Sequence, residues 1–485
     1  MRKKLTLVLA GCIFLGLALP ACRSEAGITE QSIPTSTTLA LPLETSSEAK
    51  ISLDAGSGQP DVLTAVPDQK TILPADNVQD LDDGPVHIYA FSEDFRTQID
   101  SLYLLDHPDF KYDYQMVSPA DYEKRLSALF SSTDQMPDII MLGASFATQY
   151  TGSAEILGVD RLGIASDELA DQYSFSHQYM TDSTGSIKAL AWKLSPVGLY
   201  YNRTVAKMYL GTSDPQEVSE HFSSWNSFLE SARNVNEKSG GTVKVVAGMD
   251  ALCRGYMFSR INPWIQDEKV VWDQHASDFL DFYQAITGEN LTFNEARGSQ
   301  EWWAHGKDQS VLAYLMTYEE FTTKMGFALP VEGEEPDPNA NPTSGDWALC
   351  EAPADFFLDG VWLAATADND KMATTAELFR YFTISKSSLE ALADTGFFVN
   401  SKSVMDNMAK AVSRNDPFLA GQNPYTVLAK SAGEIHVSFL TERDEVIEAV
   451  FYSVTRAYAS GAIPQKSEAE EMFLTDCEDL GFASD

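Results

Sequence analysis

The chain has 485 residues, of which 44% are hydrophobic and 22% are charged, and its formal net charge is −37 at pH 7. Such an acidic surface repels phosphate backbones and anionic lipid headgroups. The composition therefore argues against a nucleic-acid-binding protein and against a protein that binds an anionic membrane surface. The length is sufficient for two ordinary domains with separate cores.

The first residues predict export from the cell. Three basic residues at positions 2–4 precede an apolar run over 5–19, which is too short to span a bilayer. The run ends in Leu19-Pro20-Ala21-Cys22, which resembles the lipobox of bacterial lipoproteins. This resemblance implies that residues 1–21 are a signal peptide and that Cys22 carries the lipid. The alternative is a plain secretory signal.

The next segment predicts a flexible tether. Residues 23–85 contain no Phe, Trp or Tyr, and Ser, Thr, Pro, Asp and Glu dominate them. Such a stretch buries too little apolar surface to offset the entropy lost on ordering. We therefore expect residues 22–85 to be the lipid-bearing cysteine plus a disordered tether, and the folded part to begin at Val86.

The first folded segment alternates strands with helices. Apolar strands are predicted at 86–91, 112–117 and 136–142, and helical spacing lies between them, around 99–105 and 122–130. The last strand is almost continuously apolar, as is typical of strands buried on both faces of a parallel sheet. Alternation of this kind predicts an α/β fold.

The pattern then repeats. A buried strand over 189–201 leads into a helix capped by Asn202 and ended by Gly211, and Tyr200 and Tyr201 on this strand are expected in the core. Another helix follows Ser224. Further strands are predicted at 243–247, 309–316 and 361–367, and a Pro- and Glu-rich loop over 330–345 precedes the stretch 347–353. The last hundred residues are predicted to be largely helical.

No motif indicates catalysis or a cofactor. The seven His form no metal-ligand pattern, and the sequence contains no GxSxG, P-loop or GxGxxG motif. Cys253, Cys350 and Cys477 show no CxxC spacing, so we expect small buried hydrophobic residues there. Glu319-Glu320, or Asp355 with Asp359, would suit a glycosidase only at a carboxyl separation that sequence does not reveal. We expect no enzyme, no metal and no cofactor.

Several stretches agree with one family in the same order over residues 86–465. They are Pro137-Asp138-Ile139-Ile140, Gly198-Leu199-Tyr200-Tyr201-Asn202, Trp225-Asn226-Ser227-Phe228, Gly306-Lys307, Asp359-Gly360-Val361-Trp362 and Thr395-Gly396-Phe397-Phe398-Val399-Asn400-Ser401. Together they resemble the motifs of family-1 extracellular solute-binding proteins of ABC importers, the maltose-binding-protein-like, carbohydrate-binding group.

The resemblance implies a two-lobed, type II periplasmic-binding-protein-like fold. Each lobe has a central sheet flanked by helices, and the chain crosses the hinge more than once, here near Ser195, Gly345 and Ser385. The implied lobes are 86–195 with 346–384, and 196–345 with 385–485. The ligand is expected between the lobes at the carboxyl ends of strands, as in other open α/β sheets.

The resemblance also implies a function. It is the capture of a mono- or oligosaccharide by a monomer on the outer face of the cytoplasmic membrane, anchored by lipid alone, and delivery to ABC permease subunits. A peptide or polyamine ligand on the same fold, or a secreted carbohydrate-active enzyme, are the alternatives.

Candidate ligand-binding residues follow from the same resemblance and from the predicted strand ends. Tyr318 stands where the family places its cleft tryptophan, which implies stacking on a sugar ring; the alternative is a tyrosine packed within the second lobe. The full set is Phe91, Ser92, Glu93, Ser145, Phe146, Ser195, Arg254, Tyr256, Trp264, Tyr318, Glu319, Asp359 and Trp362.

Overall fold

The computed structural model describes residues 78–132, 135–325 and 342–484, and all structural statements concern these ranges. The predicted signal peptide, Cys22 and the tether up to residue 77 lie outside them. Within the described ranges, no helix combines the length and apolar character needed to cross a bilayer.

The first part of the sheet contains parallel strands in the order β2-β1-β3. They are β1 (Val86–Ala90), β2 (Tyr112–Met116) and β3 (Ile139–Gly143), and all five residues of β3 are buried. These strands confirm the predicted ones to within three residues at each end. They form what we call the first half of the protein.

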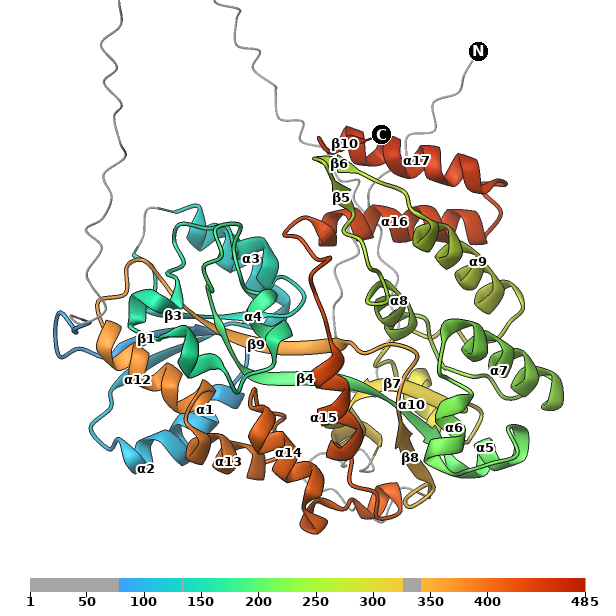
Figure 1. Cartoon of the computed structure of the whole chain (residues 1–485), viewed down its shortest axis with the longest axis horizontal. Helices are drawn as coiled ribbons and strands as arrows, with labels where there is room; N and C mark the ends of the chain where they lie inside the picture. Colours follow the sequence, from blue (N-terminus) through green and yellow to red (C-terminus); the bar gives the residue numbers. More distant parts are fainter. Residues whose placement is uncertain (1–77, 133–134, 326–341, 485) are drawn as a thin grey trace, which may run out of the picture. The chain divides into compact units, whose positions relative to one another are not determined.

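One long strand connects this sheet with the rest of the molecule. Strand β4 (Leu190–Asn202) pairs through residues 190–196 with β9 (Phe357–Ala365), which also pairs with β3. Residues 197–202 of β4 then pair with β7 (Ala313–Thr317) and β8 (Trp347–Cys350), which belong to what we call the second half (Figure 1). Within the part of the chain that the structure describes, one seven-stranded sheet therefore runs through both halves.

Helices cover both faces of the first half. On one face, Phe95 and Phe382 pack near Trp192 of β4; on the other, Phe175 packs on Phe357 of β9. The elements involved are α1 (Asp94–Gln98), η2 (Ile99–Tyr103), α2 (Leu104–Asp106), α3 (Pro119–Phe130), η3 (Ala147–Tyr150), η4 (Val159–Leu162), η5 (Ser166–Leu169), α4 (Ser174–Gln178), α12 (Met372–Thr383) and α13 (Lys386–Asp394).

The remaining elements lie with the second half or along β4, and the end of the chain is helical as predicted. Strands β5 (Ile265–Gln266), β6 (Lys269–Val270) and β10 (Ala483–Ser484) form a small separate sheet. The others are α5 (Arg203–Tyr209), α6 (Pro215–Glu220), α7 (Trp225–Lys238), α8 (Asp250–Met257), α9 (Gln274–Gly288), α10 (Gln300–Lys307), α11 (Tyr318–Glu320), η6 (Phe321–Met325), α14 (Lys402–Lys410), η7 (Val412–Arg414), η8 (Pro417–Leu419), α15 (Tyr425–Glu434), α16 (Asp444–Ala459) and α17 (Lys466–Asp479).

The connections between the halves differ in part from the expected ones. The chain passes from the first half to the second within β4, close to Ser195, and the return runs from β8 to β9 over residues 351–356. Gly345, an expected crossing point, lies before β8, where its N–H donates to the Phe418 carbonyl. Helix α13, expected in the second lobe, contacts α12 and η2 of the first half.

Local predictions at the end of β4 are confirmed. Asn202 Oδ1 accepts the Val205 N–H and caps α5, and Gly211 follows that helix with φ +92°. Tyr200 and Tyr201 are fully buried. Residues 243–247 form only isolated bridges, Lys244 with Val311 and Val246 with Thr292, instead of the predicted strand.

The segment that precedes Val86 packs against the first half of the protein. Asp80 Oδ1 accepts the N–H groups of Ala373 and Thr374 at the start of α12, and Asp82 pairs with the buried Lys371 ammonium. The Asp80 carboxylate satisfies backbone donors that a helix start leaves unpaired, and Asp82 compensates the charge of the buried ammonium. Residues 80–82, which the sequence places at the end of the tether, therefore contact the folded part.

Candidate functional site

A cavity of about 220 Å³ lies beside β4, where elements of both halves meet. Lys193 to Pro196 of β4 form one wall, and Thr317 to Glu319, at the carboxyl end of β7, form another. The rest is lined by residues 322–323, by residues 395–398, and by Tyr425 and Leu428 of α15. Open α/β sheets usually bind ligands at the carboxyl ends of their strands.

Lys193 is the charged centre of this cavity. Its Nζ lies 2.7 Å from Glu319 Oε2 of the second half and 3.3 Å from Asp94 Oδ2 of the first half. The β4–β9 register shifts between Ala191 and Lys193. Bulges of this kind re-aim side chains, and both Trp192 and Lys193 contact the ring of Phe397.

Aromatic side chains supply the apolar surface of the cavity. Tyr318 lies edge-on to Tyr425, with 5.6 Å between ring centroids, and its hydroxyl donates to Asp416 Oδ2 at 3.0 Å. Burial and the Asp416 carboxylate hold the pKa of Tyr318 well above its usual value, so the hydroxyl stays protonated. Phe397 adds a third ring. Such a lining suits the apolar faces of a small polar solute.

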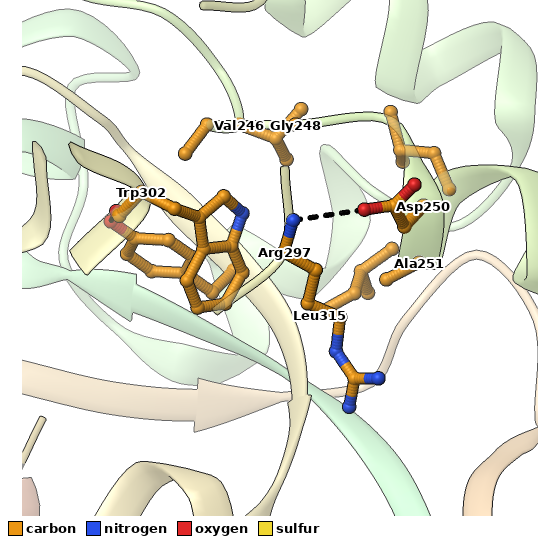
Figure 2. A pocket seen from close by; sticks show the side chains of 10 residues that line it. Val246, Gly248, Asp250, Ala251, Arg297, Trp302 and Leu315 are labelled. Carbon is orange, nitrogen blue, oxygen red and sulfur yellow. Dashed lines mark hydrogen bonds between the residues drawn. The ribbon is translucent and has the colours of Figure 1, made fainter. Parts of the chain in front are cut away.

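A second, much smaller cavity lies in the second half (Figure 2). The Arg297 N–H donates to Asp250 Oδ2, and the guanidinium lies 2.7 Å from Glu320 and 3.7 Å from Asp359 of β9. The cavity volume is about 10 Å³, which is enough for about one water molecule. The ion pairs of Arg297 connect Glu320, which follows β7, with Asp359 near the start of β9. The cavity itself is too small for a solute.

Three predicted site residues lie together in the larger cavity. They are Ser195, Tyr318 and Glu319. Asp359 is directly paired with Ser195 in the β4–β9 register, and its carboxylate is close to Arg297.

The predicted residues after β1 and β3 lie at the ends of those strands. Phe91 packs near Phe146, with 6.1 Å between ring centroids, and Glu93 pairs with Arg96 at 3.6 Å. Ser92 accepts the Asp94 N–H, while Ser145 is exposed. Among them, Ser92 and Glu93 adjoin Asp94, which bonds to Lys193.

Four predicted residues lie outside the cavity lining and pack within one half or the other. Trp264 is 1% exposed and packs against Arg260, Phe451 and Phe473, while Trp362 is 0% exposed and donates to the Ser176 carbonyl. Neither indole has an open face for a ligand, contrary to expectation.

The other two lie on α8. Tyr256 is buried among Trp225, Phe279 and Phe282. Arg254 pairs with Glu448 of α16 at 3.6 Å.

The sequence prediction missed Lys193, Phe397 and Tyr425. Lys193 had a visible sign, because it is the single charge within the apolar run 189–201. Phe397 lies in a stretch used for the family resemblance, whereas nothing near Tyr425 distinguishes it. Tertiary packing alone brings α15 against β4.

The chemistry available here is binding through hydrogen bonds and ring contacts. Glu319 is paired with Lys193, and Glu320 accepts the N–H of Thr317 and pairs with Arg297. Within the described ranges, no three His, Cys, Asp or Glu side chains are arranged to hold a metal ion. The three cysteines at 253, 350 and 477 are free, and Cys350 and Cys477 are buried as expected.

Comparisons with known proteins bear on the fold. No protein-family model matches the sequence, and no curated protein sequence matches it. Among solved structures, an extracellular solute-binding protein of family 1 aligns with a TM-score of 0.69 and 15% identity over 82% of this chain and 99% of its own.

Two further structures align similarly. The sugar-binding protein MalE of Xanthomonas citri aligns with a TM-score of 0.63 and 13% identity, over 81% of this chain and 96% of its own. The galacto-N-biose/lacto-N-biose I-binding protein of a Bifidobacterium longum ABC transporter, solved with lacto-N-biose, aligns with a TM-score of 0.60 and 15% identity, over 83% and 100%. The chain therefore has the two-lobed fold of the extracellular solute-binding proteins.

Proposed function

We propose that the protein is a lipid-anchored, extracellular solute-binding protein that captures a carbohydrate between its halves and delivers it to an ABC importer. The observation that carries this proposal is the cavity beside β4, which combines aromatic rings with a carboxylate and hydroxyl groups. Sugars present apolar C–H faces and hydroxyl groups, and this lining complements both. The sugar-binding proteins that share the fold support the same assignment.

A saccharide screen tests the proposal. We expect mono- or oligosaccharides to raise the melting temperature of the purified protein, because a ligand that binds the folded state stabilises it. Calorimetry should then give a one-to-one complex. A parallel reducing-end assay should show no release from glycans. Peptides or polyamines that stabilise the protein while every saccharide fails would contradict the carbohydrate assignment, and steady release of reducing ends would identify an enzyme.

The membrane anchor is a separate part of the proposal. Cys22→Ala should move the protein from the membrane fraction to the medium, because the variant lacks the cysteine that would carry the lipid. Even one acyl chain gives only marginal membrane binding, so a variant without any should be released. Fractionation with immunoblotting measures the change, and mass spectrometry of the wild type should find lipid on Cys22. A variant that stays in the membrane fraction would show that Cys22 is not the anchor.

Delivery to an importer requires permease partners. We propose that the protein acts as a monomer that docks on permease subunits in its ligand-bound form. Co-purification with candidate permeases, with and without the sugar found in the screen, tests this step.

A further inference from the structure

The ammonium group of Lys193 is enclosed on three sides. Glu319 and Asp94 pair with it at 2.7 Å and 3.3 Å, and the ring of Phe397 lies 4.9 Å away. The Lys193 side chain is only 10% exposed. An ammonium group has three donors, and here two face carboxylates while the third side is covered by a ring.

The two carboxylates, in contrast, remain open. The side chains of Glu319 and Asp94 are 49% and 46% exposed. Among the described residues lining the cavity, the charged ones are Lys193 and Glu319. Asp94 pairs with Lys193 from outside the lining and adds a second negative charge. Each carboxylate keeps lone pairs that Lys193 does not use.

We propose that this arrangement selects the ligand by charge: the cavity accepts a single uncharged or amino-bearing sugar ring and disfavours a ring that carries a carboxylate. This inference rests on the proposed function. A hydroxyl or ammonium group donates to Glu319, whereas a carboxylate only accepts and would face the like charge of Glu319, with Asp94 already paired to Lys193. The cavity volume of about 220 Å³ lies below the roughly 300–1,000 Å³ of drug-sized ligand sites, which favours about one ring.

Matched monosaccharides test the selection. We would measure binding of glucose, glucosamine and glucuronic acid, and of galactose, galactosamine and galacturonic acid, by calorimetry at pH 7 and constant ionic strength. In the series that binds, the uronic acid should bind at least about tenfold more weakly than the neutral sugar, and the amino sugar at least as tightly. In Glu319→Gln, the gap between uronic acid and neutral sugar should shrink to less than about threefold.

A control variant and a ligand-free readout accompany these measurements. Glu289→Gln removes an exposed carboxylate that pairs with Arg233, and neither residue lines the cavity, so the variant should leave the ratio unchanged. Amine acetylation followed by mass spectrometry should label the exposed Lys430 readily and Lys193 slowly, and Glu319→Gln should speed up the labelling of Lys193.

The outcomes separate this inference from the proposed function. A uronic acid that binds as tightly as its neutral counterpart overturns the charge selection and leaves carbohydrate binding intact. Oligosaccharide binding without any monosaccharide binding overturns the single-ring site but supports the proposed function. Failure of every saccharide overturns both. Rapid labelling of Lys193 in the wild type contradicts the enclosure on which the selection depends.

Discussion

Tyr318 has the features of a ligand-contacting ring and of a packed side chain at once. It lines the cavity, and it also bonds to Asp416 and packs on Tyr425. We predict that Tyr318→Ala weakens sugar binding by about 2 kcal/mol, or roughly thirtyfold, because the ring is a stacking surface. Calorimetry on the wild type and the variant measures this loss.

Tyr318→Phe is the matched control. It keeps the ring and removes the hydrogen bond to Asp416, so it should retain most of the affinity while lowering the free energy of unfolding by about 1 kcal/mol. A folded Tyr318→Ala protein with unchanged affinity would show that the ring only packs.

Glu448 is predicted to make stability depend on pH. Burial raises its pKa to about 6, although Arg254 lowers it. Between about pH 4.5 and pH 6 the unfolded chain releases this proton while the folded protein keeps it, so stability should fall as pH rises, by about 2 kcal/mol in total. Urea denaturation at pH 4.5, 5.5 and 7 measures the change.

Glu448→Gln should remove this component of the pH dependence, since the amide does not titrate. Glu468→Gln, at an exposed position on α17, should retain it. Identical pH profiles for the wild type and Glu448→Gln would mean that Glu448 has an ordinary pKa in the folded protein.

At the scale of elements, α12 depends on a residue far away in the sequence. Its first turn has no side-chain cap of its own, and Asp80 accepts the N–H groups of Ala373 and Thr374 instead. Asp80→Ala should therefore lower the free energy of unfolding by about 1 kcal/mol. Chemical denaturation measures the effect, and Asp83→Ala, at an exposed neighbour, is the control that should change little. Equal stability of both variants would argue that the cap is absent in solution.

At the scale of the whole molecule, we predict that ligand binding brings the two halves closer together. They share β4 and the β8–β9 connection, and a ligand that contacts both halves favours the closed form by binding it more tightly. Small-angle scattering of the wild type should show a smaller radius of gyration at saturating sugar than without it. The same profile with and without a sugar that calorimetry shows to be bound would exclude this motion.

Sequence patterns predicted the elements better than their assembly. The β4 strand, its Asn202 cap and the Gly211 helix end are local features that backbone chemistry dictates, and all three are confirmed. Trp264 and Trp362, which the sequence predicts to contact ligand, instead lie in the core. A buried ring and a stacking ring have the same side chain, so composition does not distinguish them.

The sequence alone determined the acidic charge, the alternation of strands and helices, and the order of motifs that pointed to a two-lobed fold, because these follow from residue types and their order along the chain, without knowledge of which distant residues meet. Only the tertiary structure decided that Lys193 lies between Asp94 and Glu319, almost 100 residues before it and more than 100 after it. A register shift in β4 and the packing of residue 397 set that position. Such contacts depend on how distant strands pair, which local periodicity does not encode.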